Sequence, residues 1–99
     1  MRNPVYNTLA VYDIADVKRL ARVAKIVKDY GERVQKSVFE LFVSTKELRE
    51  LHNRVNRVID VGFDSVRYYF VCETDWQKRE YLGVNKFVDE DWNRSFMIV

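Results

Sequence analysis

A change of hydrophobic periodicity near residue 13 constrains the fold of this chain more than any other feature. Residues Thr8–Tyr12 form a short apolar run, which is typical of a strand buried on both faces of a sheet. The run stops at Asp13. From Asp16 onward apolar residues recur at three- and four-residue spacing as far as Gly31, which predicts an amphipathic helix. A buried strand followed at once by such a helix is typical of α/β and α+β domains.

The rest of the chain also alternates between helical and strand-like patterns. Ser44 and Glu47 are spaced as a capping box ahead of a helical apolar stripe, and Gly62 closes that stripe, so a second helix is expected between them. Three further segments rich in Val, Phe and Tyr are expected to be strands: Arg33–Val43, Ser65–Glu73 and the shorter Arg79–Val84.

We expect an α+β fold of the class with the order βαββαβ, although the segments named above follow one another as β, α, β, α, β, β. Right-handed crossovers fold that order most simply into a ferredoxin-like sandwich, an antiparallel sheet with two helices on one face. Residues 1–84 would form this domain. Residues 85–99 would be a C-terminal tail, whose apolar end Ser95–Val99 could add a strand to a sheet edge.

Both faces of the expected sheet carry apolar residues. Phe39 and Leu41 alternate with Val38 and Phe42 along one predicted strand, so only one of the two sets can lie under the helices. The other set needs a second cover, which another copy of the chain would provide. The pattern therefore favours a homodimer formed through the sheets.

Composition excludes several classes of protein. A chain of 99 residues with 47% hydrophobic residues can build one modest core and no second domain. The single cysteine, Cys72, rules out an internal disulfide framework and a cysteine zinc cluster, which indicates a cytoplasmic location. No apolar run approaches the roughly 20 residues of a membrane-spanning helix, so no membrane association is expected.

The basic residues concentrate in the first half of the chain. Residues 1–44 hold eight Lys and Arg against five Asp and Glu, whereas residues 45–99 hold nine against ten. Lys18, Arg22 and Lys25 form a stripe along the first helix, with Arg19 beside it. Such a stripe can be a solvated helix face or a surface that binds phosphates, because a nucleic-acid backbone requires a row of cations.

Asp13 has two interpretations. It could cap the first helix or form a turn, with Asp16 as its rival for the cap. Alternatively, in a two-fold dimer whose axis passes near the end of the first strand, two Asp13 carboxylates would face each other and hold one Mg²⁺. One or two carboxylates suffice for this ion because water and phosphate oxygens complete its octahedron.

The residues around Asp13 also form a recognisable motif string. The first strand and its end, together with Arg19, Arg22 and the segment that follows the first helix, resemble the CRISPR-associated protein 2 family. The similarity runs from about Val5 to Phe42 and rests on five groups of residues: Leu9–Asp16, Arg19, Arg22–Ala24, Tyr30-Gly31 and Arg33–Glu40.

This resemblance implies a ferredoxin-like homodimer in which Asp13 binds a divalent metal, Mg²⁺ or Mn²⁺, between the two copies. It also implies endonuclease activity on RNA or double-stranded DNA, with Asp13 as the catalytic residue, and a role in spacer acquisition as a bridge between dimers of the CRISPR integrase. Tyr12 and Phe39 flank the motif. The expected nucleic-acid contacts are Lys18, Arg19, Arg22, Arg33 and Lys36, the last at a position where the family leads us to expect an aromatic residue.

Two other functions remain open. The chain could be a scaffold of the same complex without turnover, since bridging the integrase does not obviously need the metal site. It could also be a ferredoxin-like sensor domain that binds a small molecule at a dimer edge and has no salt-sensitive affinity for nucleic acid. The basic first helix argues against a sensor.

Overall fold

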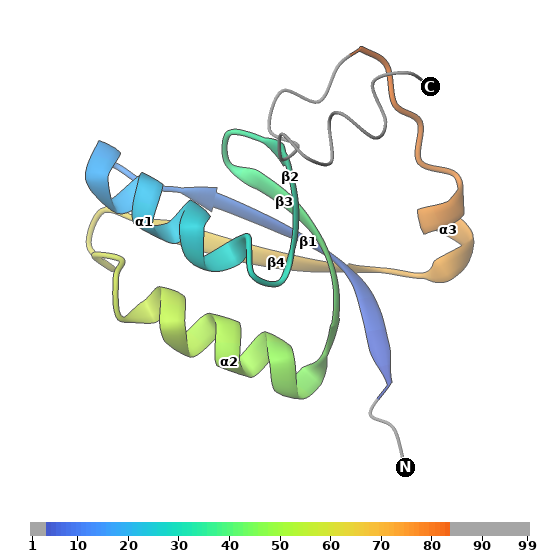
Figure 1. The fold of residues 1–99 in the computed structure, drawn as a ribbon, viewed down its shortest axis with the longest axis horizontal. Coiled ribbons are helices and arrows are strands. Elements are labelled where there is room, and N and C mark those ends of the chain that lie inside the picture. The colour runs from blue at the N-terminus through green and yellow to red at the C-terminus, as the bar shows by residue number, and fades with distance from the viewer. Residues whose placement is uncertain (1–3, 84–99) are drawn as a thin grey trace.

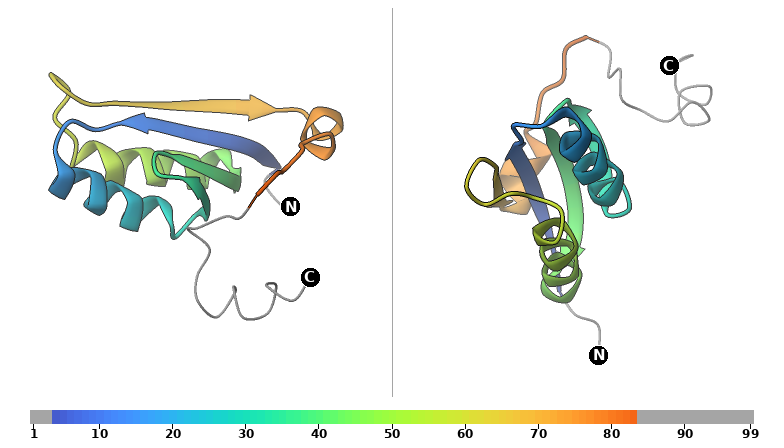
Figure 2. Two further views of the ribbon diagram at one scale, coloured as in Figure 1. Left: turned by 90° about the horizontal axis from the view of Figure 1, so that it is seen from above. Right: turned by 90° about the vertical axis from the view of Figure 1, so that its left-hand side faces the viewer.

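A single antiparallel sheet organises the computed structural model, which describes residues 4–83. The strand order across the sheet is β2-β3-β1-β4, and helices α1 and α2 both lie against one face of it (Figures 1 and 2). The order along the chain is βαββαβ followed by a short helix α3, so the expected ferredoxin-like α+β fold is confirmed. The elements are β1 (Val5–Asp13), α1 (Val17–Val27), β2 (Gly31–Gln35), β3 (Val38–Ser44), α2 (Thr45–Asn56), β4 (Ser65–Val71) and α3 (Glu73–Gln77).

Strand β1 lies at the centre of the sheet and pairs with both β3 and β4. Its alternate residues Thr8, Ala10 and Tyr12 are buried beneath the helices, while Asp13 is exposed at the strand end. In β3 the same alternation buries Phe39 and leaves Val38 and Phe42 on the opposite face, as the sequence predicts. The core is completed by the apolar faces of the two helices, which contribute Val23, Ala24, Val27, Leu51 and Val55.

Capping residues fix where both long helices begin. The Asp16 carboxylate accepts a hydrogen bond from the Arg19 backbone N–H at 2.9 Å and so caps α1. At α2 the predicted capping box is present: Ser44 Oγ accepts from the Glu47 N–H at 3.1 Å, and Glu47 accepts from the Ser44 N–H at 2.9 Å. Asp13 is therefore not a helix cap.

The predicted single strand Arg33–Val43 is wrong, because this segment turns back at Lys36 and Ser37. Its two halves form the hairpin β2–β3, in which Gln35 pairs with Val38, and a bulge interrupts the ladder between Arg33 and Gln35. The turn contains no glycine, asparagine or aspartate, the residues that usually mark two-residue hairpins. Periodicity alone could not reveal it.

The hairpin also explains Gly31, which begins β2. A Cβ atom at Gly31 would collide with the carbonyl oxygen of Glu40 on β3, so the close approach of these two strands requires glycine. Helix α1 has already ended at Val27, with Lys28 as its C-cap. Gly31 therefore serves strand pairing rather than the helix stop that the sequence predicted.

The predicted strand Arg79–Val84 is also wrong for the residues that the structure describes. Residues 79–83 have no strand conformation, and the residues just before them form α3. Arg79 instead stacks its guanidinium 3.9 Å from the Trp76 ring centre and pairs with Glu40 at 2.8 Å. Side-chain contacts absent from the sequence pattern thus determine this segment.

Two further expectations concern the C-terminal tail and membrane association. The tail 85–99, with its possible edge strand, lies outside the described residues, as does Val84. Within residues 4–83 no helix is both long enough and apolar enough to cross a bilayer.

Candidate metal and nucleic-acid site

Asp13 lies where β1 ends on the sheet face that carries no long helix. It pairs in register with Ser65, the first residue of β4, and its side chain is exposed. Because Asp16 performs the capping of α1, the Asp13 carboxylate is not committed to that helix. The position leaves it available to a metal ion or to solvent.

A shallow hollow of about 200 Å³ surrounds Asp13 on this open face. A hydrogen bond to Tyr69 raises the pKa of the Arg67 guanidinium, so a permanent positive charge lies in the same hollow. Among residues 4–83 the lining side chains come from two neighbouring strands, β1 and β4: Val11, Tyr12, Asp13, Ser65, Arg67 and Tyr69.

One chain contributes few metal ligands here. Among residues 4–83 no group of three or more His, Cys, Asp or Glu side chains is arranged to hold an ion. Of the residues that the structure describes, Asp13 is the only acidic one that lines the hollow, and Ser65 adds a hydroxyl. A complete ion site therefore needs oxygen donors from water, from substrate phosphate or from a second copy of the chain.

Tyr12 and Arg33 secure the β2–β3 turn beside the end of β1. Both donate to the carbonyl oxygen of Lys36, Tyr12 through its hydroxyl at 3.1 Å and Arg33 through Nη2 at 2.6 Å. Burial raises the pKa of the Tyr12 hydroxyl, with nearby Arg33 opposing the shift. The Arg33 guanidinium also lies 6.0 Å from the ring centre of Phe39. These three motif residues form one supporting cluster, and Lys36 is exposed at the hairpin tip.

Arg19 is held by a carboxylate that the sequence analysis missed. Its Nε and Nη2 donate to the two oxygens of Asp64 at 2.8 and 3.2 Å. Asp64 has a fully buried side chain and also accepts from the backbone N–H groups of Ala15 and Asp60. Arg19 and these hydrogen bonds hold the pKa of the Asp64 carboxyl well below its usual range. Asp64 thus joins α1 and the loop after β1 to the loop before β4.

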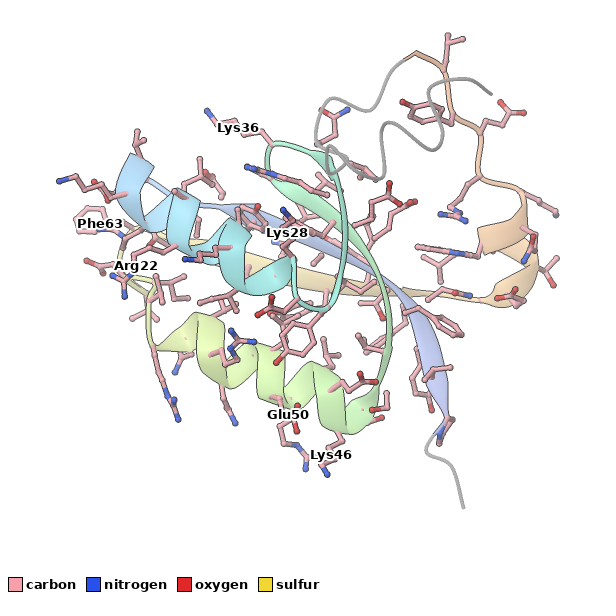
Figure 3. All side chains as sticks on the ribbon, in the orientation of Figure 1. Arg22, Lys28, Lys36, Lys46, Glu50 and Phe63 are labelled. Carbon is pink, nitrogen blue, oxygen red and sulfur yellow. The ribbon has the colours of Figure 1, made fainter. Side chains whose placement is uncertain are left out.

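The predicted nucleic-acid contacts lie in two places, at the β2–β3 turn and on α1. Figure 3 places Lys36 at the tip of the β2–β3 turn and Arg22 on the other side of α1, toward the α2–β4 loop. Lys18 and Arg22 are exposed, and in the part of the chain that the structure describes neither has an ion-pair partner. The structure therefore separates cations that the sequence suggested as one row.

Comparison with known proteins identifies relatives along most of the chain. Residues 6–79 match the family described as CRISPR associated protein Cas2. The chain is 39% identical over 77 residues to CRISPR-associated endoribonuclease Cas2 3 of Chloroflexus aurantiacus, covering 78% of this chain and 83% of that protein. It is 45% identical over 73 residues to CRISPR-associated endonuclease Cas2 2 of Thermus thermophilus, covering 74% and 77% respectively.

Solved structures give the same result. The crystal structure of Streptococcus pyogenes Cas2 superposes with a TM-score of 0.71 at 38% identity, covering 78% of this chain and 99% of that one. A Thermus thermophilus structure described as hypothetical protein TT1823 superposes with a TM-score of 0.72 at 39% identity, covering 81% and 93%. Sequence and fold thus agree on the same relatives.

Proposed function

This chain belongs to the CRISPR associated protein Cas2 family, and we propose that it is a metal-dependent endonuclease that hydrolyses phosphodiester bonds in RNA or double-stranded DNA. Relatives named as endoribonucleases and endonucleases support this activity. The observation that carries the proposal is the exposed Asp13 carboxylate, which caps no helix and lines a hollow on the open face of the sheet.

The donors at this site fit a hard divalent cation. The Asp13 carboxylate and the Ser65 hydroxyl offer oxygen atoms, which Mg²⁺ and Mn²⁺ prefer. The missing acidic donor would be Asp13 of a second copy, related by a two-fold axis. When bound, the ion would lower the pKa of a coordinated water and polarise the phosphodiester.

The open sheet face supports such a pairing of two copies. Phe42 and Tyr69 are 61% and 47% exposed there, and Val11 and Val38, which pair with each other in register, lie farther along the same face toward Asp13. Burying this face against its own copy would remove apolar area from water and would bring two hollows together. We therefore propose a homodimer through the sheets.

The basic side chains would bind the substrate backbone. Lys18, Arg22 and Lys36 are exposed and would each neutralise a phosphate. Arg33 and Arg19 would also contact phosphate. Arg33 is held by its hydrogen bond to the Lys36 carbonyl, and Arg19 is held by its ion pair with Asp64. Arg67 in the hollow would place a positive charge near the phosphodiester at Asp13.

The alternative function is that of a scaffold, which would bridge copies of the CRISPR integrase without cleaving nucleic acid. The small number of acidic ligands favours it: in the described residues, one carboxylate per chain lines the hollow. Bridging would use the surface of the dimer and would survive loss of Asp13.

Cleavage assays with Asp13→Asn separate these two functions. Purified protein with Mg²⁺ or Mn²⁺ is expected to cut RNA or double-stranded DNA, and Asp13→Asn is expected to lose at least about a hundredfold in rate, as removal of a group that stabilises transition-state charge typically does. Glu50→Gln removes an exposed carboxylate on α2 and is the matched control, with an unchanged rate. Equal cleavage by wild type and Asp13→Asn, or cleavage by neither, would contradict the catalytic proposal and favour the scaffold.

A further inference from the structure

The loop between α2 and β4 exposes an aromatic side chain beside the Asp13 site. Phe63 is 76% exposed and Val61 is 79% exposed. Phe63 comes two residues before Ser65, the register partner of Asp13. Chain geometry therefore keeps the Cα atom of Phe63 within about 13 Å of that of Asp13. This distance allows one bound strand to reach both residues.

Hydrogen bonds fix the conformation of this loop. The backbone N–H groups of Phe63 and Asp64 donate to the Asp60 carbonyl at 2.9 and 2.7 Å, and the Gly62 N–H donates to the Asp60 carboxylate at 2.9 Å. Asp64 then attaches the loop to Arg19 on α1 and to the backbone of Ala15. The loop thus holds Phe63 in a defined position, and its side chain stays exposed to solvent.

The charges around Phe63 suit a polyanion. Arg22 lies three residues after Arg19 and so on the same side of α1, facing the loop that Arg19 contacts. Arg57 caps the end of α2 where the loop begins. In residues 4–83 neither Arg22 nor Arg57 has an ion-pair partner. Asp60 is an acidic residue of the same loop, and its carboxylate accepts a hydrogen bond from the Gly62 backbone N–H.

We propose that Phe63 stacks on an unpaired nucleobase of a strand whose adjoining phosphodiester lies at Asp13, with Arg22 contacting the backbone. Aromatic rings bind bases of any identity through their faces, while neighbouring cations hold the phosphates. A fully paired duplex offers no such face except at its ends. This inference rests on the proposed nuclease function and adds to it a preference for single-stranded or unpaired segments.

Binding of oligonucleotides to Phe63→Ala tests the proposal. The probes are a single strand and a blunt duplex of the same sequence, each with 2-aminopurine as fluorescent base. Phe63→Ala is expected to weaken single-strand binding roughly five- to a hundredfold, because stacking on one base contributes about that much. Duplex binding should change less than about twofold, and the dependence of single-strand affinity on salt should keep its slope.

Two variants in the same loop region serve as controls. Phe63→Trp keeps an aromatic face and should retain single-strand affinity, whereas Val61→Ala removes apolar surface of similar exposure and should have little effect. An unchanged affinity in Phe63→Ala would overturn the proposal. An equal loss in Val61→Ala would also overturn it and would point to an apolar contact with a protein. If the wild type itself shows no salt-sensitive binding, the proposed function fails together with this inference.

Discussion

Asp64 supports the region around the proposed metal site although it does not line the hollow. Its buried carboxylate accepts from Arg19, Ala15 and Asp60, so a single side chain fixes the loops on both sides of the Asp13 edge. The sequence gives little sign of this role, because Asp64 follows a glycine-containing turn and is 49 residues from Ala15. Asp13, by contrast, could be predicted because its position at the end of a strand is a local feature.

Asp64→Asn should lower thermal stability strongly at neutral pH. The amide cannot neutralise Arg19 or accept with both of its terminal atoms, so we expect the Tm at pH 7 to fall by about 5 °C or more. The hydrogen bonds depress the pKa of Asp64 in the folded state. Its contribution is therefore fully present above the unfolded pKa of about 3.9 and is lost as the pH falls through the folded value.

Thermal unfolding at several pH values measures this effect. The difference in Tm between wild type and Asp64→Asn should be constant from pH 7 to about pH 5 and should begin to shrink below about pH 4. Glu50→Gln on the exposed face of α2 should follow the wild type throughout. A difference that is small at pH 7, or that grows on acidification, would contradict the assigned role of Asp64.

Helices of this chain could be predicted from sequence more completely than its strands. The capping box of α2 and the apolar stripe of α1 depend on residues three or four positions apart, and both are confirmed. The β2–β3 turn and the conformation of residues 79–83 depend on contacts with distant segments. Lys36 is held by Tyr12, 24 residues away, and Arg79 is paired with Glu40. Such contacts leave no periodic signal.

Ser44→Ala should destabilise the domain by about 1 kcal/mol, because it removes the side-chain oxygen that caps α2. Chemical denaturation at pH 7 gives this free energy from the shift in midpoint at constant slope. Thr45→Ala changes the next residue, which is exposed and is not the cap, and should cause no loss. Equal stability of Ser44→Ala and wild type would show that the observed capping box contributes little to folding.

At the scale of the whole molecule, the two faces of the sheet differ in how they are covered. The helices bury one face completely around Phe39 and Leu41, whereas Phe42 and Tyr69 remain exposed on the other. The hollow at Asp13 lies on that exposed face. The proposed dimer and the proposed metal site are therefore linked, because in this proposal the ion would be held by one Asp13 carboxylate from each copy.

The stoichiometry of Mn²⁺ binding tests this linkage most directly. Calorimetric titration of the purified protein, with its oligomeric state measured in the same buffer, should give one Mn²⁺ per two chains in a dimer. Asp13→Asn should abolish that binding while the protein remains dimeric. One ion per chain, or undiminished binding by Asp13→Asn, would contradict a metal site shared between two Asp13 carboxylates.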